Sequence, residues 1–194
     1  TLQGDRLRFK DIAIGNLRIN AASDPSGVIN LSELNLENQG SVLQGSGSVQ
    51  VFEKNSFTVN PDFPADISLT LKNIEPKDFL TKLSVDGTLG GKIDVKGNMK
   101  AMSAGVALQG DRLRFKDITI GNFRINAASD PSGVINLSEL NLENQGSVIQ
   151  GSGSVQVFQK NSFTVNPDFP ADISLTLKNI EPKDFLTKLS VDGT

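Results

Sequence analysis

The chain has 194 residues, with 19 Lys and Arg against 22 Asp and Glu, so its formal net charge is -3. Such a balance provides no basic field for a phosphate backbone, and we expect no nucleic acid among its partners. Cys and His are both absent from the sequence, which excludes thiol nucleophiles, Ser-His-Asp triads, zinc sites and haem or iron–sulfur ligation. We therefore expect no enzyme activity, no metal and no cofactor.

An internal repeat organises the sequence, because Leu2 returns as Leu108 and the match then runs to Thr194 with an offset of 106 residues. The copies differ at four positions: Ala13/Thr119, Leu17/Phe123, Leu43/Ile149 and Glu53/Gln159. The sequence predicts copy 1 at residues 1–88, joining strands of the same continuous sheet at 89–107, and copy 2 at 108–194. Copy 2 stops inside a strand-like run, so we expect a longer parent protein with further copies.

The predicted elements are strands, since apolar and polar residues alternate with period two. In chain order the alternation is clearest at residues 17–21, 43–51, 67–71, 85–97 and 102–108. Short turns such as residues 23–27 can join only antiparallel neighbours, so the strands form a meander. We count roughly seven strands in each unit, each about 4.8 Å from the next.

Interruptions of this pattern predict three further features. One-residue phase slips between Phe9 and Ile12, Leu31 and Leu34, and Leu108 and Leu113 indicate bulges or short breaks. Residues 53–65, which hold two prolines, predict a loop. Apolar residues spaced along 74–83 after Pro76 predict a short helical turn near residues 76–83.

The apolar face of each unit carries on the order of twenty large side chains. Leaving them exposed to water would lose roughly 30 to 60 kcal/mol of the free energy that their burial provides. Something must cover this face: a second sheet, closure of the sheet on itself, or apolar ligands in a trough. Inward glycines such as Gly45 and Gly47 permit sharp curvature or simply close packing.

Other motifs point to structure more than to chemistry. Residues 24–27 (DPSG) have no further acidic residue at calcium-loop spacing, so we interpret them as a turn. Arg6, Arg8 and Lys10 form a small basic stripe, which we interpret as a solvated sheet face with anionic head groups as the alternative.

Three stretches resemble the AsmA-like and TamB-like proteins of Gram-negative envelopes: residues 83–98 (LSVDGTLGGKIDVKGN), 104–113 (AGVALQGDRL) and 63–74 (FPADISLTLKNI). The resemblance covers most of each copy and consists of alternating apolar residues with recurring Gly and Asp. It implies a long antiparallel sheet folded lengthwise into an open groove, called a β-taco. It also implies an inner-membrane anchor, a periplasmic location, and phospholipid acyl chains carried along the groove towards the outer membrane.

The sequence-based hypothesis is thus an all-β, elongated antiparallel meander curled into an open apolar groove that shields phospholipid acyl chains in the periplasm. The alternative is a structural or adhesive stalk of a bacterial surface protein built from tandem β-sandwich repeats. The residues predicted to line the lipid groove are Leu17, Ile19, Ile29, Leu31, Leu43, Val49, Val51, Ile67, Leu69, Leu71, Val85, Leu89, Ile93, Val95, Met102, Val106, Leu108, Phe123, Ile125, Ile135, Leu137, Ile149, Val155, Val157, Ile173, Leu175, Leu177 and Val191.

Overall fold

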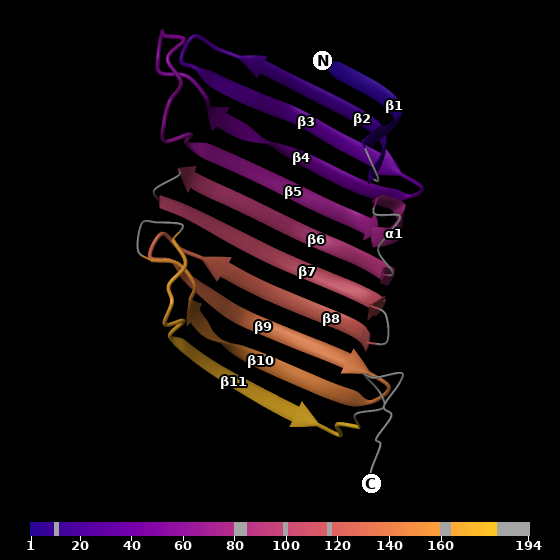
Figure 1. The fold of residues 1–194 in the computed structure, drawn as a ribbon. Coiled ribbons are helices and arrows are strands. Elements are labelled where there is room, and N and C mark those ends of the chain that lie inside the picture. The colour runs from indigo at the N-terminus through magenta and orange to yellow at the C-terminus, as the bar shows by residue number, and fades with distance from the viewer. Residues whose placement is uncertain (10–11, 80–84, 99–100, 116–117, 160–163, 182–194) are drawn as a thin grey trace.

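The computed structural model describes residues 1–9, 12–79, 85–98, 101–115, 118–159 and 164–181. These residues form one antiparallel sheet of eleven strands that follow one another in chain order (Figure 1). The strands are β1 (Leu2–Phe9), β2 (Ile12–Ser23), β3 (Val28–Asn38), β4 (Ser41–Gln50), β5 (Ala65–Ile74), β6 (Val85–Asn98), β7 (Ala101–Phe115), β8 (Ile118–Ser129), β9 (Val134–Asn144), β10 (Ser147–Gln156) and β11 (Ala171–Lys178). A single helical turn, α1 (Pro76–Phe79), follows β5.

The sheet is continuous from one sequence copy to the next. β6 pairs with β5 on one side and with β7 on the other, and β7 pairs with β8. The strands β2 to β5 have their counterparts in β8 to β11, and the second half of β7 is the counterpart of β1. Most of β6 and the first half of β7 fall in the stretch that joins the copies. The repeating unit therefore contains six strands, β2 to β7, where we expected seven.

The difference in strand number arises at the phase slips. Between Leu108 and Leu113 the chain continues as one strand, β7, and the slip is a bulge against β8. Between Leu31 and Leu34 it is likewise a bulge, against β4. Phe9 and Ile12, by contrast, end β1 and begin β2 and pair with each other, so the chain reverses there.

The loop predicted at residues 53–65 begins slightly earlier in the structure, because β4 ends at Gln50 and β5 starts at Ala65. The backbone N–H groups of Val51 and Phe52 both donate to the carbonyl of Gly27, at 3.0 and 3.1 Å. Phe52 also forms an isolated bridge with Val59. Copy 2 repeats the bonds from Val157 and Phe158 to Gly133. Val51 and Val157, which we predicted on strands, therefore lie in the connections.

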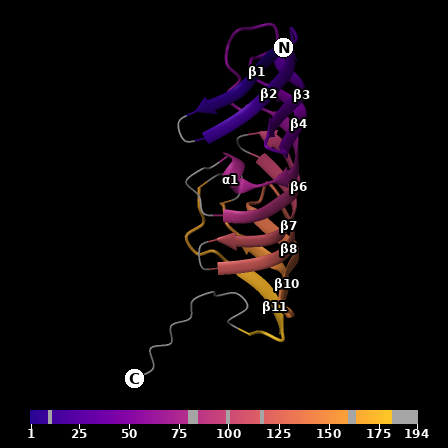
Figure 2. The same cartoon turned by 90° about the vertical axis from the view of Figure 1, so that its right-hand side faces the viewer.

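The sheet is bent rather than flat. Figure 2 shows that β1, β2, β6, β7 and β8 extend to the same side, and that α1 lies on that side between β2 and β6. α1 contacts both β2 and β6. The shorter strands between them end earlier, so α1 occupies the place that they leave. The prediction of a helical turn near 76–83 is met by α1 over residues 76–79, and residues 80–84 lie outside the described part.

Candidate functional site

One face of the sheet carries apolar side chains in an unbroken row across the strands. Directly paired residues of an antiparallel sheet project to the same face. The pairings connect one such residue from each of the eleven strands. The row consists of Gly4, Leu17, Leu36, Leu43, Leu71, Gly91, Leu108, Ile125, Leu140, Gly151 and Leu175. No polar side chain interrupts this row, and it crosses the boundary between the copies without a change of face.

A second row, two residues further along each strand, is apolar as well. It consists of Leu2, Ile19, Leu34, Gly45, Leu69, Ile93, Val106, Ala127, Leu137, Gly153 and Ile173. The bulge at Leu31 and Leu34 keeps both leucines on this face, since the strand would otherwise have turned its apolar residues to the opposite side.

The opposite face carries charged residues, several of which pair across neighbouring strands. Asp66 binds Lys96 at 3.1 Å, and Asp86 binds Arg114 at 3.2 Å. All four side chains are more than half exposed, and such ion pairs contribute little to stability. This face is in contact with solvent, and its charges keep the two faces chemically distinct.

The apolar face has no second layer over it in the part of the chain that the structure describes. Among the large apolar side chains described, Ile74 and Leu113 are the two that are buried. Most of the others in the two rows are half-buried, because neighbours on adjacent strands shield their flanks while their tips stay accessible. An apolar surface that extends over many strands without a covering layer is a candidate binding surface.

Glycines give the side chains of this face room to lie down along the sheet. A Cβ atom at Gly45 would lie 2.7 Å from Cδ2 of Leu69 and 3.3 Å from Cδ2 of Leu34. In copy 2 the Cβ of a residue at Gly110 would meet the ring of Phe123. Neighbouring side chains therefore fill the space that a Cβ atom would take at these glycines. The apolar face is smoother as a result.

Most predicted groove residues lie on strands and half-buried, as the two rows illustrate. Three of them, Ile173, Leu175 and Leu177 on the outermost strand β11, are 55, 57 and 61% exposed. Val51 and Val157 lie in connections, as described above, and Val191 lies outside the described residues.

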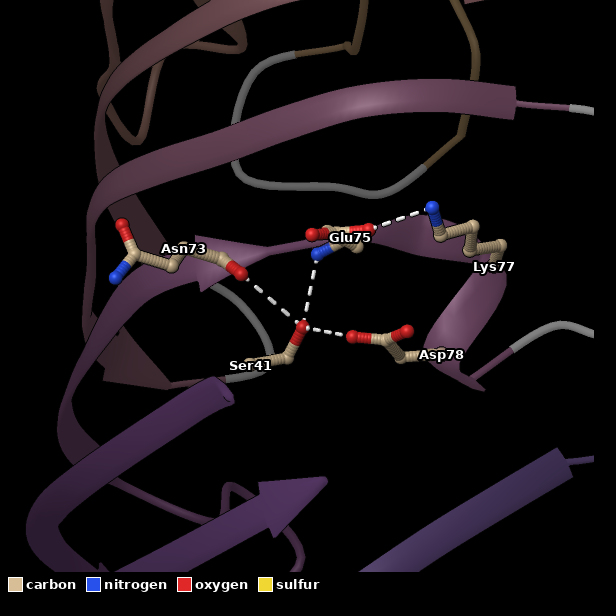
Figure 3. Close-up of polar contacts among 5 residues, drawn as sticks. All are labelled: Ser41, Asn73, Glu75, Lys77 and Asp78. Carbon is tan, nitrogen blue, oxygen red and sulfur yellow. Dashed lines mark hydrogen bonds and ion pairs between the residues drawn. The ribbon is translucent and has the colours of Figure 1, made fainter. Parts of the chain in front are cut away.

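A buried polar cluster beside the sheet holds α1 in place, as Figure 3 shows. The Ser41 hydroxyl, fully buried at the start of β4, accepts a hydrogen bond from the backbone N–H of Glu75 at 2.8 Å. It lies within donating distance of Asp78 Oδ2 (2.7 Å) and of the Asn73 carbonyl (3.1 Å). The Asn38 side-chain amide donates to the Asp78 carbonyl. The bonds join the β3–β4 turn, the end of β5 and α1.

The serine and its two backbone partners recur in the described residues of copy 2. Ser147 is fully buried, accepts from the N–H of Glu181 at 3.0 Å and donates to the Asn179 carbonyl at 2.8 Å. Ser41 and Ser147 are fully buried, so their hydroxyls are out of reach of a substrate. The cluster positions α1, and neither its chemistry nor its burial suits a substrate. This cluster could not be predicted from the sequence, because an isolated Ser followed much later by Asp has no recognisable spacing.

The Asp24 turn has the geometry of a local cap. The Asp24 carboxylate accepts from the Ser26 hydroxyl, from the Ser26 N–H at 2.9 Å and from the Val28 N–H at 3.4 Å. These hydrogen bonds, that of the Ser26 hydroxyl foremost, lower the pKa of Asp24 below its ordinary value of 3.8. Asp130 makes the same turn in copy 2 with the same effect on its pKa. Over the described residues, no group of three or more acidic side chains is placed to hold a metal ion.

A cavity beside β1 is lined by Arg6, Arg8, Asn16 and Glu37, and has a volume of about 540 Å³. Its counterpart in copy 2, lined by the equivalent residues from Arg112 to Gln145, measures about 370 Å³. In copy 2, Arg114 is bound to Asp86, so the basic character of this place is partly neutralised.

Within the described ranges, none of the helical structure has the length and apolarity needed to cross a bilayer. No family model matches this chain, and neither the curated proteins nor the solved structures contain a significant match.

Proposed function

We propose that this chain is a segment of a lipid-bridge protein of the cell envelope, whose apolar face shields the acyl chains of phospholipids. The observation that supports the proposal is the pair of apolar rows, which run across all eleven strands with no covering layer in the described residues. An acyl chain is the ligand that suits such a surface, because it is long, apolar and indifferent to the position of polar groups.

The proposed mechanism is passive. Each CH₂ group that leaves water for the apolar face gains about 0.8 kcal/mol, and the uniform rows give no single position where a chain would be trapped. In this proposal the bent strands form the groove of a β-taco, and the polar head groups stay in water along its open side. The parent protein would work in the periplasm, with further copies of the unit extending the path.

The alternative is a structural stalk of a surface protein, favoured by the near-identity of the two copies. A stalk of β-sandwich repeats requires two packed sheets in each repeat, whereas the described residues of both copies share one sheet. A purely structural role does not explain why a single sheet would keep its apolar face uncovered. The lipid hypothesis supplies that reason, so we prefer it.

Phospholipid bound to the purified chain tests the proposal. The chain is purified without detergent from the soluble fraction of bacterial cells, and the bound lipid is quantified by mass spectrometry. Wild type should carry phospholipid, and Leu69→Arg, which places a charge in the middle of an apolar row, should lose most of it. Ile93→Arg, next in the same row, should repeat the loss.

Ser46→Arg is the matched control, because Ser46 is exposed and pairs with Ser68 on the polar face. It adds the same charge to the adjacent strand and should retain the lipid. Circular dichroism establishes that each variant is folded. Absence of phospholipid from folded wild type, or equal loss from Ser46→Arg and Leu69→Arg, would reject the lipid hypothesis and favour the stalk.

A further inference from the structure

The outermost strand, β11, repeats a strand whose binding partner is visible elsewhere in the same sheet. Residues 171–180 (ADISLTLKNI) are identical to residues 65–74, which contain β5. β5 is paired on both sides, with β4 and with β6. β11 pairs with β10 in the register that β5 uses with β4. Its other edge has no paired strand among the described residues.

The apolar residues of β11, which is paired on one side, are more exposed than those of β5, which is paired on both sides. Ile67, Leu69 and Leu71 of β5 are half-buried, whereas their counterparts Ile173, Leu175 and Leu177 are 55 to 61% exposed. The residues are the same, and the inner neighbour strands differ only at Leu43 and Ile149. The added exposure therefore reflects the lack of an outer strand among the described residues.

β11 has few of the devices that keep an edge strand from pairing, since its charged residues are Asp172 and Lys178 alone. It contains no proline, and its pairing with β10 has no bulge over eight residues. β1, at the opposite end of the sheet, has two register shifts and an Arg6 with φ of 51°. A flat, apolar edge without such protection is a template for a further strand.

From this geometry we propose that the outer edge of β11 is a docking site for a strand with the sequence of residues 89–97, as a further unit of the repeat would present it. In the β5–β6 register, Ala65 faces Gly97, Ile67 faces Val95 and Leu69 faces Ile93. The same register on β11 places Val95 opposite Ile173 and Ile93 opposite Leu175. The docking strand thereby extends both apolar rows.

Charged groups favour the same register. Lys96 binds Asp66 at 3.1 Å across β5 and β6, and Asp172 is the counterpart of Asp66. Lys92 foremost, and then a hydrogen bond with the Ser68 hydroxyl, lower the pKa of Asp94, and Ser174 is the counterpart of Ser68. Asp172 and Ser174 are thus placed to bind Lys96 and Asp94 of an incoming strand.

The last residues of the chain do not match this site. Residues 189–194 repeat residues 83–88, and in copy 1 the described residues of that segment pair with β7 and not with β5. The segment that pairs with β5 runs from Leu89 to Gly97, and the 194 residues contain it once, within β6. The partner strand is therefore the equivalent of residues 89–97 in a further unit of the repeat, and the mode of binding is β-strand addition.

A fluorescein-labelled peptide of residues 89–98 (LGGKIDVKGN) tests the proposal against the complete 194-residue chain. Fluorescence anisotropy should show saturable binding of one peptide per chain. A scrambled peptide of the same composition should bind at least about tenfold more weakly, which is the discrimination that about 1.4 kcal/mol provides. Hydrogen exchange should show new protection in residues 171–178 and none in residues 2–9.

The register is tested by exchanging charges. Asp172→Lys should weaken binding of the peptide by about two- to fivefold, as expected for an exposed ion pair, and Lys96→Asp in the peptide should restore it. Asp66→Lys, in the already paired β5, is the control and should leave binding unchanged. The proposal is overturned if binding is not saturable, if the scrambled peptide binds equally well, or if protection appears over the apolar face instead of β11. These outcomes do not depend on lipid binding, so they separate this inference from the proposed function.

Discussion

The Leu69→Arg substitution distinguishes an open apolar face from a closed core by its effect on stability alone. Leu69 lies in mid-sheet between Gly45 and Ile93 and is half-buried, with its Cδ2 above Gly45. Full burial of a leucine contributes about 1.5–3 kcal/mol, so a half-buried leucine contributes about 1–2 kcal/mol. The arginine stem can cover part of the same surface while its guanidinium reaches water. We therefore expect a loss of about 1–2 kcal/mol in the free energy of unfolding.

A closed core predicts a larger loss, because an unpaired buried charge costs about 3–5 kcal/mol. The repeat provides a control in Leu175→Arg, the same substitution on β11, where the leucine is 57% exposed. Its loss should stay below about 1 kcal/mol. Urea unfolding followed by far-UV circular dichroism measures both, with equal m-values required for the comparison. A loss above about 3 kcal/mol for Leu69→Arg, or equal losses for the two variants, would refute the open face.

Four further substitutions test other features of the fold. Gly47→Ala should lower the free energy of unfolding by more than about 1 kcal/mol in urea titrations, because φ is 154° and the new Cβ would lie 2.3 Å from the Asp66 carbonyl. Gly105→Ala, in open space, should be neutral or stabilising by up to about 1 kcal/mol, and an equal loss in both would refute the steric argument. Ser41→Ala should remove about 1–3 kcal/mol by leaving buried polar partners unsatisfied, with faster amide exchange in α1; unchanged exchange would contradict its role. Asp24 has a pKa below 3.8 in the folded chain, so its stabilisation should be complete well above pH 3.8 and disappear as the pH falls through the lowered pKa. Asp24→Asn should therefore show a smaller acid-induced loss of stability than wild type, and an identical pH profile would contradict this.

The alternating pattern predicts strands well where it is uninterrupted and less well where it slips. Residues 85–97 alternate without a fault, and β6 covers Val85–Asn98. A phase slip has the same appearance in the sequence whether the chain reverses, as at Phe9 and Ile12, or continues through a bulge, as in β7. The choice depends on the neighbouring strand, and for this reason the expected seven strands became six.

The candidate site shows the same division between local and non-local information. Which face a residue occupies depends on its position along the strand, so the apolar face could be predicted from the sequence. The accessibility of a residue on that face could not be predicted. Leu69 and Leu175 have identical neighbours in sequence, but Leu69 is less exposed because β6 pairs with its strand. The end of β4 before Val51 was also beyond prediction, because the Gly27 carbonyl that accepts its N–H comes from another part of the chain.

The pairing of the strands also fixes the direction in which the molecule would lengthen. The row that begins at Leu17 reaches Ile125 after six strands, whereas the counterpart of Leu17 in copy 2 is Phe123. The line joining equivalent residues therefore departs from the perpendicular to the strands by two residues, about 7 Å, over an advance of about 29 Å. That is an inclination of about 13°, so the register shifts each successive unit only slightly along the strands. An acyl chain following the face would cross each strand almost at right angles and meet the same surroundings once in every unit.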